Sequence, residues 1–287
     1  MAVEISNKQL VASYQNFFGN FYPLKNDTIF KKIIIKILQF LFPLIVKILN
    51  SKRLFLSKLK KIYFDQNIKS KKIEINLNQS SRNFLNNNGW CFIENFLDDN
   101  TYNSIYNYWP DENHFLLGSK LVKYYYTAFK SVKKSKPKNI EKFYYLNNFY
   151  DYICSEQFDF QMSNFLSNND DKYKCYSILS SICKKNNFLA PHRDGIAKKN
   201  LDKKVFNFIY FIDGNNSIPE FSGATGLFED NNFEKANFIP KNIKNTCLVY
   251  DSSDKFFHGF KALAKNGHRK AITFQFFQDD IYENLNG

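Results

Sequence analysis

The chain has 287 residues, of which 44% are hydrophobic and 18% aromatic, enough for a sizeable core in one domain with an extension or in two small domains. Its 5 cysteines are odd in number and form no Cys-x-x-Cys pair, which argues against a zinc site or a disulfide framework and fits a reducing cytoplasm. The net charge of +13 is common among nucleic-acid-binding proteins, but the abundance of Lys, Asn, Ile and Phe is also typical of a codon bias toward A and T.

The basic charge is concentrated near the start of the chain. Residues 1–80 carry 14 Lys and Arg against 4 Asp and Glu, a net charge of +10 out of the total of +13. Within them, residues 28–50 have the pattern of a basic amphipathic helix, with a kink expected at Pro43. Its apolar stripe consists of Ile33, Ile34, Ile37, Leu38, Leu41 and Ile45. We predict that residues 1–75 form a basic helical N-terminal extension and that residues 76–287 form a separate domain.

Two interpretations of this extension remain open. The simpler one is a helical layer that packs on the downstream domain. The other is peripheral contact of residues 28–61 with an anionic membrane surface, where basic amphipathic helices can lie. A membrane span is not expected, because the apolar stretch between Lys36 and Lys47 is too short to cross a bilayer. No signal peptide is expected, because Glu4 stands where a positively charged region would be. We predict a cytoplasmic protein.

Three helical stretches lie in the first half of the second domain. They are expected at residues 99–108, 140–152 and 156–166, and we expect them to pack on one face of a β-rich core. Beyond them the sequence becomes β-prone, for example at residues 245–250, which are followed by a polar turn.

Two histidines and one aspartate have the spacing of a metal site. His192 and Asp194 are two residues apart, so in a strand they project from the same face, and His258 comes from a later strand. Two imidazoles and one carboxylate form the facial triad that holds non-haem Fe(II) and leaves three coordination positions open. Half of the 4 histidines fall in this pattern, and we predict that the three residues are catalytic metal ligands. A single histidine is more often structural than a ligand, and we interpret His114 and His268 as structural or surface residues.

Arg269 stands eleven residues after His258, at the start of a β-prone run over residues 269–277. In a strand, Ala271 and Thr273 share its face, while Ile272 lies on the opposite face. A buried arginine here would need an anionic partner, and a planar carboxylate matches its two-pronged donor geometry. We predict that Arg269 binds the carboxylate of a ligand.

The His-x-Asp pair, the distal histidine and the arginine together resemble the iron- and 2-oxoglutarate-dependent oxygenases. The resemblance covers about residues 173–277, and it includes residues 223–228, which are similar to the family's Gly-Gly-x-Leu stretch. Residues 84–97 resemble the helix and strand that precede the family's core. The resemblance implies an α+β fold with a double-stranded β-helix (jelly-roll) core, packed helices and, in this chain, a helical N-terminal extension.

The resemblance also implies the chemistry. His192, Asp194 and His258 would hold Fe(II), 2-oxoglutarate would chelate the metal while Arg269 pairs with its far carboxylate, and O2 would take the last position. The implied activity is that of a dioxygenase hydroxylating a small or medium-sized organic substrate, with an anionic substrate as one option. Many members have a serine hydroxyl two residues after the arginine, where this chain has Ala271. Cofactor-binding hydroxyls from Thr273 or Tyr176 would then replace it.

Other departures from the family pattern narrow the class of reaction and substrate. Gln275 stands where nucleic-acid-repair members have a second arginine, which argues against a specific nucleic-acid partner. His268 stands where collagen-type prolyl hydroxylases usually have lysine, and Asp194 argues against a halogenase. A protein or peptide hydroxylase on the same core remains an alternative. So does a non-catalytic jelly-roll binding module that associates with a membrane surface. The oligomeric state is not predicted.

Overall fold

The structure of the chain is a computed structural model. It describes residues 73–110, 115–117, 126–132, 144–167, 171–184, 187, 189–193, 204–215, 223–230, 235–252, 256–261, 263 and 266–278, together with helical positions 29, 33, 37, 41, 44, 48 and 51. At positions 116, 117, 126–132, 190 and 192 only the backbone is described.

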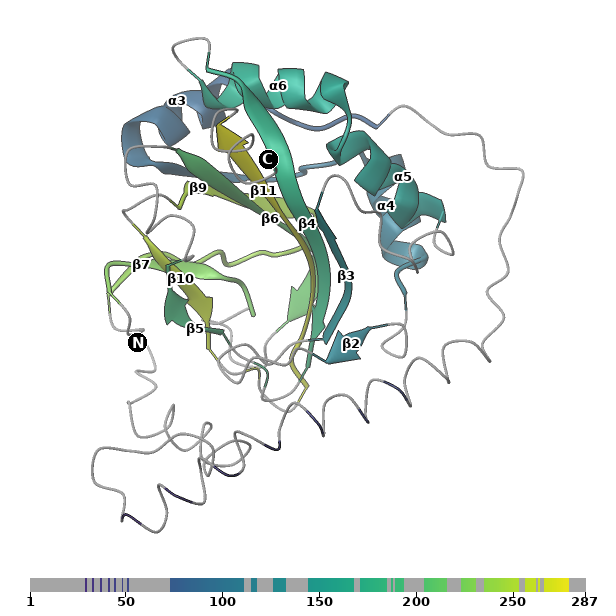
Figure 1. Cartoon of the computed structure of the whole chain (residues 1–287). Coiled ribbons are helices and arrows are strands. Elements are labelled where there is room, and N and C mark those ends of the chain that lie inside the picture. Colours follow the sequence, from purple (N-terminus) through teal and green to yellow (C-terminus); the bar gives the residue numbers. More distant parts are fainter. Residues whose placement is uncertain are drawn as a thin grey trace.

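Two antiparallel sheets form the core (Figure 1). The larger sheet has the strand order β1 (Trp90–Ile93), β9 (Thr246–Asp251), β6 (Val205–Asn215), β11 (His268–Gln278), β4 (Tyr173–Cys183), β3 (Tyr126–Val132) and β2 (Leu116–Leu117). The smaller sheet has the order β5 (Leu189–His192), β10 (Phe257–Phe260), β7 (Gly226–Phe228) and β8 (Ala236–Phe238). From β4 to β11 the chain winds back and forth between the two sheets. This winding is that of a double-stranded β-helix, so the predicted α+β fold is confirmed.

Helices cover the outer face of the larger sheet (Figure 1). They are α3 (Gln79–Asn88), α4 (Asp99–Asn107), α5 (Tyr144–Ile153) and α6 (Glu156–Leu166). The last three correspond to the helical stretches expected at residues 99–108, 140–152 and 156–166. Capping residues fix both ends of α3: the Asn78 side chain accepts from the Ser81 N–H at 2.8 Å, and Gly89 ends the helix with a φ of 76°. Phe149 and Phe158 from the helices meet Phe274 of β11 in one buried cluster.

The inner faces of the two sheets enclose a second buried cluster. Ala271 of β11 belongs to it together with Phe211 of β6 and Leu227 of β7, whereas Ile272 and Phe274 point to the helices. The division of β11 into two faces therefore follows the two-residue period read from the sequence. Residues on the inner face are those that can contribute to a site between the sheets.

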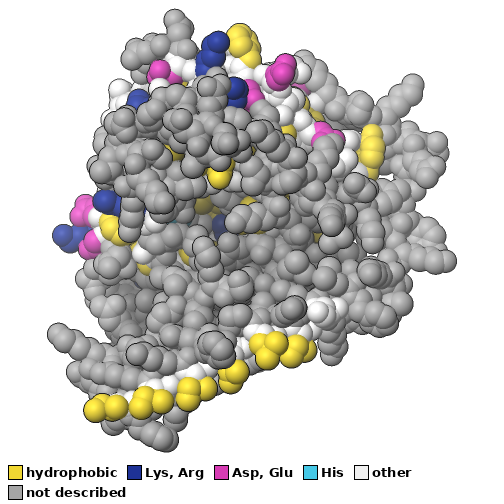
Figure 2. Space-filling model, in the orientation of Figure 1, with side chains coloured by type: hydrophobic (Ala, Val, Ile, Leu, Met, Phe, Trp, Pro, Cys, Tyr) yellow, Lys and Arg dark blue, Asp and Glu magenta, His cyan; other side chains and the backbone are white. Residues whose placement is uncertain are grey.

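The apolar side chains described in the N-terminal helix are exposed. Between 40% and 78% of the surface of each remains accessible in Ile29, Ile33, Ile37, Leu41, Leu44 and Ile48. Spacings of three and four residues place them on one side of a helix, and they form a row along the lower edge of Figure 2. This face of the helix is not packed on the domain. No helix in the described part of the chain is long and apolar enough to span a bilayer.

The predicted domain boundary after residue 75 remains a prediction. Ile73 and Ile75 already pack against the cluster between the helices and the larger sheet, and Ile75 forms an isolated antiparallel bridge with Leu97.

Candidate functional site

The two predicted histidine ligands lie opposite each other on neighbouring strands. His258 of β10 is the Cα partner of His192, the last residue of β5. In an antiparallel pair, opposite Cα atoms are about 4.5–5.5 Å apart, close enough for both residues to serve one metal ion. Asp194 and the side chain of His192 lie outside the described residues. The described side chains contain no cluster of three or more His, Cys, Asp or Glu that could hold a metal.

The side chain of His258 points between the two sheets. It is 6% exposed, and its ring centroid lies 5.2 Å from that of Tyr250 on β9 of the facing sheet. The Tyr250 hydroxyl accepts a hydrogen bond from Nδ2 of Asn207 at 2.9 Å, which fixes the ring that packs against the histidine. A buried imidazole facing an aromatic ring is held in one orientation, as a metal ligand requires.

Arg193 and Phe257, which stand next to His192 and His258 in the sequence, contact each other on the other face of the smaller sheet. The guanidinium carbon of Arg193 lies 4.5 Å from the centroid of the Phe257 ring. Because side chains alternate along a strand, this contact belongs to the opposite face of the smaller sheet from His258. Arg193 therefore points away from the face of the smaller sheet that carries His258.

Arg269 is a buried cation at the start of β11. Its side chain is 5% exposed, its Nη2 donates to the hydroxyl of Thr225 at 3.1 Å, and its Nη1 lies 3.8 Å from Sγ of Cys183. The rings of Phe260 and Phe211 lie 4.6 and 5.4 Å from the guanidinium carbon. Within the part of the chain that the structure describes, no carboxylate forms an ion pair with it. Since burying an unpaired charge among apolar groups is costly, this environment favours an anionic ligand.

Cys183 does not supply the missing negative charge. Burial raises the pKa of its thiol above the usual value, and this effect outweighs the opposing influence of the Arg269 charge. The thiol is therefore protonated at neutral pH and is only a weak partner for the guanidinium.

Several strands position Arg269 beside the histidine pair. It lies between Cys183 of β4 and Gly214 of β6 in the larger sheet, and Phe260 of β10 packs against it from the smaller sheet. Phe260 is two residues after His258 on the same strand, a distance of about 7 Å. The region around Arg269 and the histidine pair therefore adjoin each other along β10.

The structure does not bring the two predicted hydroxyl donors to Arg269. Thr273 shares the inner face of β11 but is four residues along the strand, about 13 Å away. Tyr176 stacks on Phe277 with ring centroids 4.2 Å apart, toward the other end of β11. The hydroxyl in contact with Arg269 is instead that of Thr225, directly before β7. The sequence expectation had overlooked this residue, although it lies in the glycine-containing stretch at residues 223–228.

His268 has a structural partner on the helix-covered face. Its Nε2 lies 2.9 Å from Oδ2 of Asp213, and Nζ of Lys270 lies 4.0 Å from the same oxygen. This agrees with the interpretation of His268 as a structural residue. His114 lies outside the described residues.

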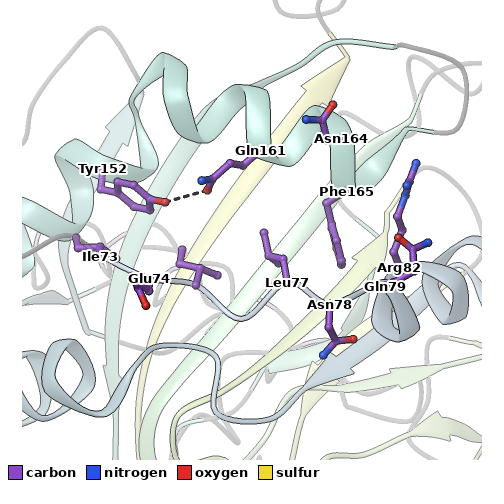
Figure 3. Close-up of a pocket in the computed structure, with 11 residues that line it drawn as sticks. Ile73, Glu74, Leu77, Asn78, Gln79, Arg82, Tyr152, Gln161, Asn164 and Phe165 are labelled. Carbon is purple, nitrogen blue, oxygen red and sulfur yellow. Dashed lines mark hydrogen bonds between the residues drawn. The ribbon is translucent and has the colours of Figure 1, made fainter.

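A large surface cavity lies away from these residues. It has a volume of about 550 Å³ and is lined by the segment that leads into α3 and by α5 and α6 (Figure 3). Tyr152 and Gln161 form a hydrogen bond of 2.9 Å in its wall, and Arg82 lies at the opposite end of the lining. None of the predicted site residues lines this cavity, so it is separate from the candidate site.

Solved structures share the fold of this chain, whereas no family model and no curated protein matches it. A prolyl hydroxylase from Trichoplax adhaerens, in complex with a hypoxia inducible factor peptide fragment, is 18% identical with a TM-score of 0.50, over 72% of this chain and 91% of that one. An oxidoreductase of the 2OG-Fe(II) oxygenase family from Burkholderia pseudomallei is 10% identical with a TM-score of 0.49, over 72% of this chain and 95% of the other. A prolyl-4-hydroxylase from Pseudomonas putida is 11% identical with a TM-score of 0.48, over 69% and 97% of the two chains. The first likeness shows that the fold is shared.

Proposed function

We propose that this chain is a non-haem Fe(II)- and 2-oxoglutarate-dependent dioxygenase that hydroxylates a small or medium-sized organic substrate. The observation that carries the proposal is the buried Arg269, which has no acidic partner in the described part of the chain and lies beside the strand that presents His258. His192, Asp194 and His258 would hold the metal, in keeping with the Cα pairing of the two histidines. When bound, Fe(II) with 2-oxoglutarate and O2 supplies the oxidant for hydroxylation, while 2-oxoglutarate leaves as succinate and CO2.

The residues of the chain bind and orient the cosubstrate and exclude water. Arg269 has the two-pronged geometry that suits the far carboxylate of 2-oxoglutarate. Phe211, Phe260 and Tyr250 line the space around Arg269 and His258 with apolar surface. An apolar environment that excludes water strengthens the ionic contact between Arg269 and the carboxylate, and it protects a reactive intermediate from water.

Two observations bear on the class of substrate. Gln275 stands in place of a second arginine, which supports a substrate other than nucleic acid. Its side-chain oxygen accepts a hydrogen bond from the Ser177 hydroxyl at 2.8 Å. The likeness to a prolyl hydroxylase solved with a peptide supports the alternative of a protein or peptide hydroxylase. A panel of metabolites and peptides, each tested for stimulated conversion of 2-oxoglutarate to succinate, separates the two classes. A wild-type protein that binds neither Fe(II) nor 2-oxoglutarate would instead be a non-catalytic jelly-roll module.

A second role, contact with an anionic membrane surface, is supported by the exposed apolar row of the N-terminal helix. Residues 29–61 contain 9 Lys and Arg and no Asp or Glu, so the segment combines apolar side chains with positive charge. Basic amphipathic helices of this kind bind at anionic interfaces. In this proposal residues 1–75 are the membrane-binding extension and the cytoplasm is the compartment. Liposome flotation tests this role. The protein should float with phosphatidylserine-containing liposomes and should not float with neutral liposomes.

A further inference from the structure

We infer that a row of uncharged polar side chains on the inner face of the larger sheet selects an uncharged substrate with a hydrogen-bonding group, such as a carboxamide. This row, which we call the polar row, consists of Tyr250, Asn207, Gln275 and Ser177. The inference rests on the proposed function and names the class of its substrate. An uncharged substrate is thereby favoured over the anionic option that the family resemblance left open.

The polar row crosses four neighbouring strands in direct register (Figure 1). Tyr250 of β9 is the Cα partner of Asn207 of β6. Gln275 of β11 is the Cα partner of Asn207 on one side and of Ser177 of β4 on the other. The Asn207 amide donates to the Tyr250 hydroxyl at 2.9 Å, and the Ser177 hydroxyl donates to Oε1 of Gln275 at 2.8 Å. The fold thus brings together four polar side chains from distant parts of the sequence.

One end of the polar row lies at the proposed metal site. The ring centroid of Tyr250 is 5.2 Å from that of His258. Neighbouring strands are about 4.8 Å apart, so Asn207 and Gln275 follow at one and two strand spacings from Tyr250. A substrate held beside the metal would therefore contact the amide side chains of the row.

The inner-face side chains around Gln275 keep accessible surface. Gln275, Ser177 and Thr273 are half-buried, whereas Phe274 and Phe276, on the helix-covered face of β11, are 0% exposed. Solvent, and hence a ligand, can reach the inner face at this position but not the face beneath the helices.

The chemistry of the polar row suits a ligand without formal charge. A side-chain amide has two N–H donors and an oxygen that accepts twice, so Gln275 can bond to Ser177 and to a ligand at the same time. A carboxylate or an ammonium group placed against the row would lose water without meeting an opposite charge there, which is costly. A carboxamide would exchange its hydrogen bonds to water for hydrogen bonds to the row.

The inner face differs in charge on the two sides of the row. Toward Arg269, the next inner position of β4, β11 and β6 is uncharged: Leu179, Thr273 and Ile209. In the other direction Lys174 is the Cα partner of Phe277, which is two residues or about 7 Å beyond Gln275. Lys174 would favour a carboxylate, whereas the row begins at Tyr250 beside the proposed metal site. Matched probes therefore distinguish Lys174 from the row.

The test measures binding of hexanamide, hexanoate and hexylamine to Fe(II)-loaded protein with 2-oxoglutarate and without O2, by titration calorimetry. Wild type should bind hexanamide at least about tenfold more tightly than the two charged probes. Gln275→Glu keeps the acceptor for Ser177 and adds a negative charge, so it should bind hexylamine most tightly. The control is Gln161→Glu, because Gln161 accepts from the Tyr152 hydroxyl at 2.9 Å in the separate surface cavity. This variant should keep the wild-type order of the three probes.

The inference is overturned if wild type binds hexanoate or hexylamine as tightly as hexanamide, and a preference for hexanoate would point to Lys174. It is also overturned if the order of the probes is the same in Gln275→Glu as in wild type. If Gln275→Glu does not fold, Ser177→Asp adds the same charge at the neighbouring position of the row. A wild-type protein that binds 2-oxoglutarate but none of the three probes would refute the polar row and leave the proposed function intact. A wild-type protein that does not bind 2-oxoglutarate would contradict the proposed function itself.

Discussion

His258 is the Cα partner of His192 on the neighbouring strand, although 66 positions separate the two residues in the sequence. His268 is only ten positions after His258, yet it lies on the helix-covered face and bonds to Asp213. The fold therefore separates a histidine suited to metal binding from a nearby structural one. Alanine variants of His258 and His268 therefore form a matched pair for testing metal binding.

We expect His258→Ala to lower Fe(II) affinity at least about 100-fold, because loss of a direct ligand should cost more than loss of its supporting partners. His268→Ala removes the same type of side chain and should retain wild-type iron content. Metal analysis after dialysis, together with succinate formation from 2-oxoglutarate, provides the measurement. Full iron occupancy in His258→Ala would show that this histidine is not a ligand.

Arg269→Lys should raise the 2-oxoglutarate concentration needed for half-maximal turnover by about 10- to 100-fold, with iron still bound. Lysine keeps the charge but loses the two-pronged donor geometry. The control is Arg82→Lys, because Arg82 donates to the Ser167 carbonyl at 2.7 Å beside the separate surface cavity. Equal cosubstrate requirements in the two variants would refute the role of Arg269.

The sequence was sufficient for features that depend on local periodicity. The two faces of β11 follow from alternation, since Ala271 is an inner residue and Ile272 an outer one. The helices at residues 99–107 and 156–166 begin at side-chain caps next to apolar-periodic stretches, and both signals are readable without a structure.

Features that depend on contacts between strands could not be predicted in this way. Thr225, directly before β7 of the smaller sheet, and Arg269 of β11 in the larger sheet are 44 positions apart, so no spacing rule connects them. Tyr176 was a reasonable candidate by residue type, but its position along β4 takes it to the opposite end of the sheet from Arg269. The amphipathic pattern of the N-terminal helix likewise does not decide whether its apolar face packs on the domain or is exposed.

The bond between Asp213 and His268 should make stability depend on pH in the acid range. The hydrogen bond from His268 is the main cause that lowers the pKa of Asp213 below its usual value of 3.8, with further contributions from the charges of His268 and Lys270. A carboxyl group with a depressed pKa stabilises the fold above its unfolded-state pKa, and this contribution is lost as the pH falls through the folded-state pKa.

Asp213→Asn should therefore lower the free energy of unfolding by about 1 kcal/mol above pH 5, with the difference from wild type shrinking as the pH falls below about 4. Urea unfolding at several pH values gives both curves. A difference that stays constant down to pH 3 would exclude the ionised carboxylate as its cause.

Asn245 should be the polar residue whose loss damages the fold most. Its buried amide bonds to both backbone groups of Leu97, at 3.0 and 2.9 Å, and accepts from the Tyr210 hydroxyl at 3.0 Å. Its φ of 54° also lies in the left-handed region that asparagine tolerates well. Asn245→Ala should lower the free energy of unfolding by about 3 kcal/mol, since it leaves buried groups unpaired. Asn76→Ala, which removes one exposed bond of 3.3 Å to the Glu94 carbonyl, should change it by less than about 0.5 kcal/mol in the same denaturant titration.

The exposed apolar row on the N-terminal helix should determine binding to anionic liposomes. Replacing Ile33, Leu41 and Ile48 with Glu removes apolar contact area and adds negative charge, so we expect the liposome-bound fraction to fall at least about tenfold. Phe160→Glu is the control, because Phe160 is 69% exposed on α6 and belongs to a different surface. Wild-type binding should also weaken with salt, since part of it is electrostatic. If the triple variant floats with liposomes as the wild type does, the row does not contact lipid. If wild-type binding resists both high salt and alkaline carbonate, the chain has a membrane-spanning segment and not a surface contact.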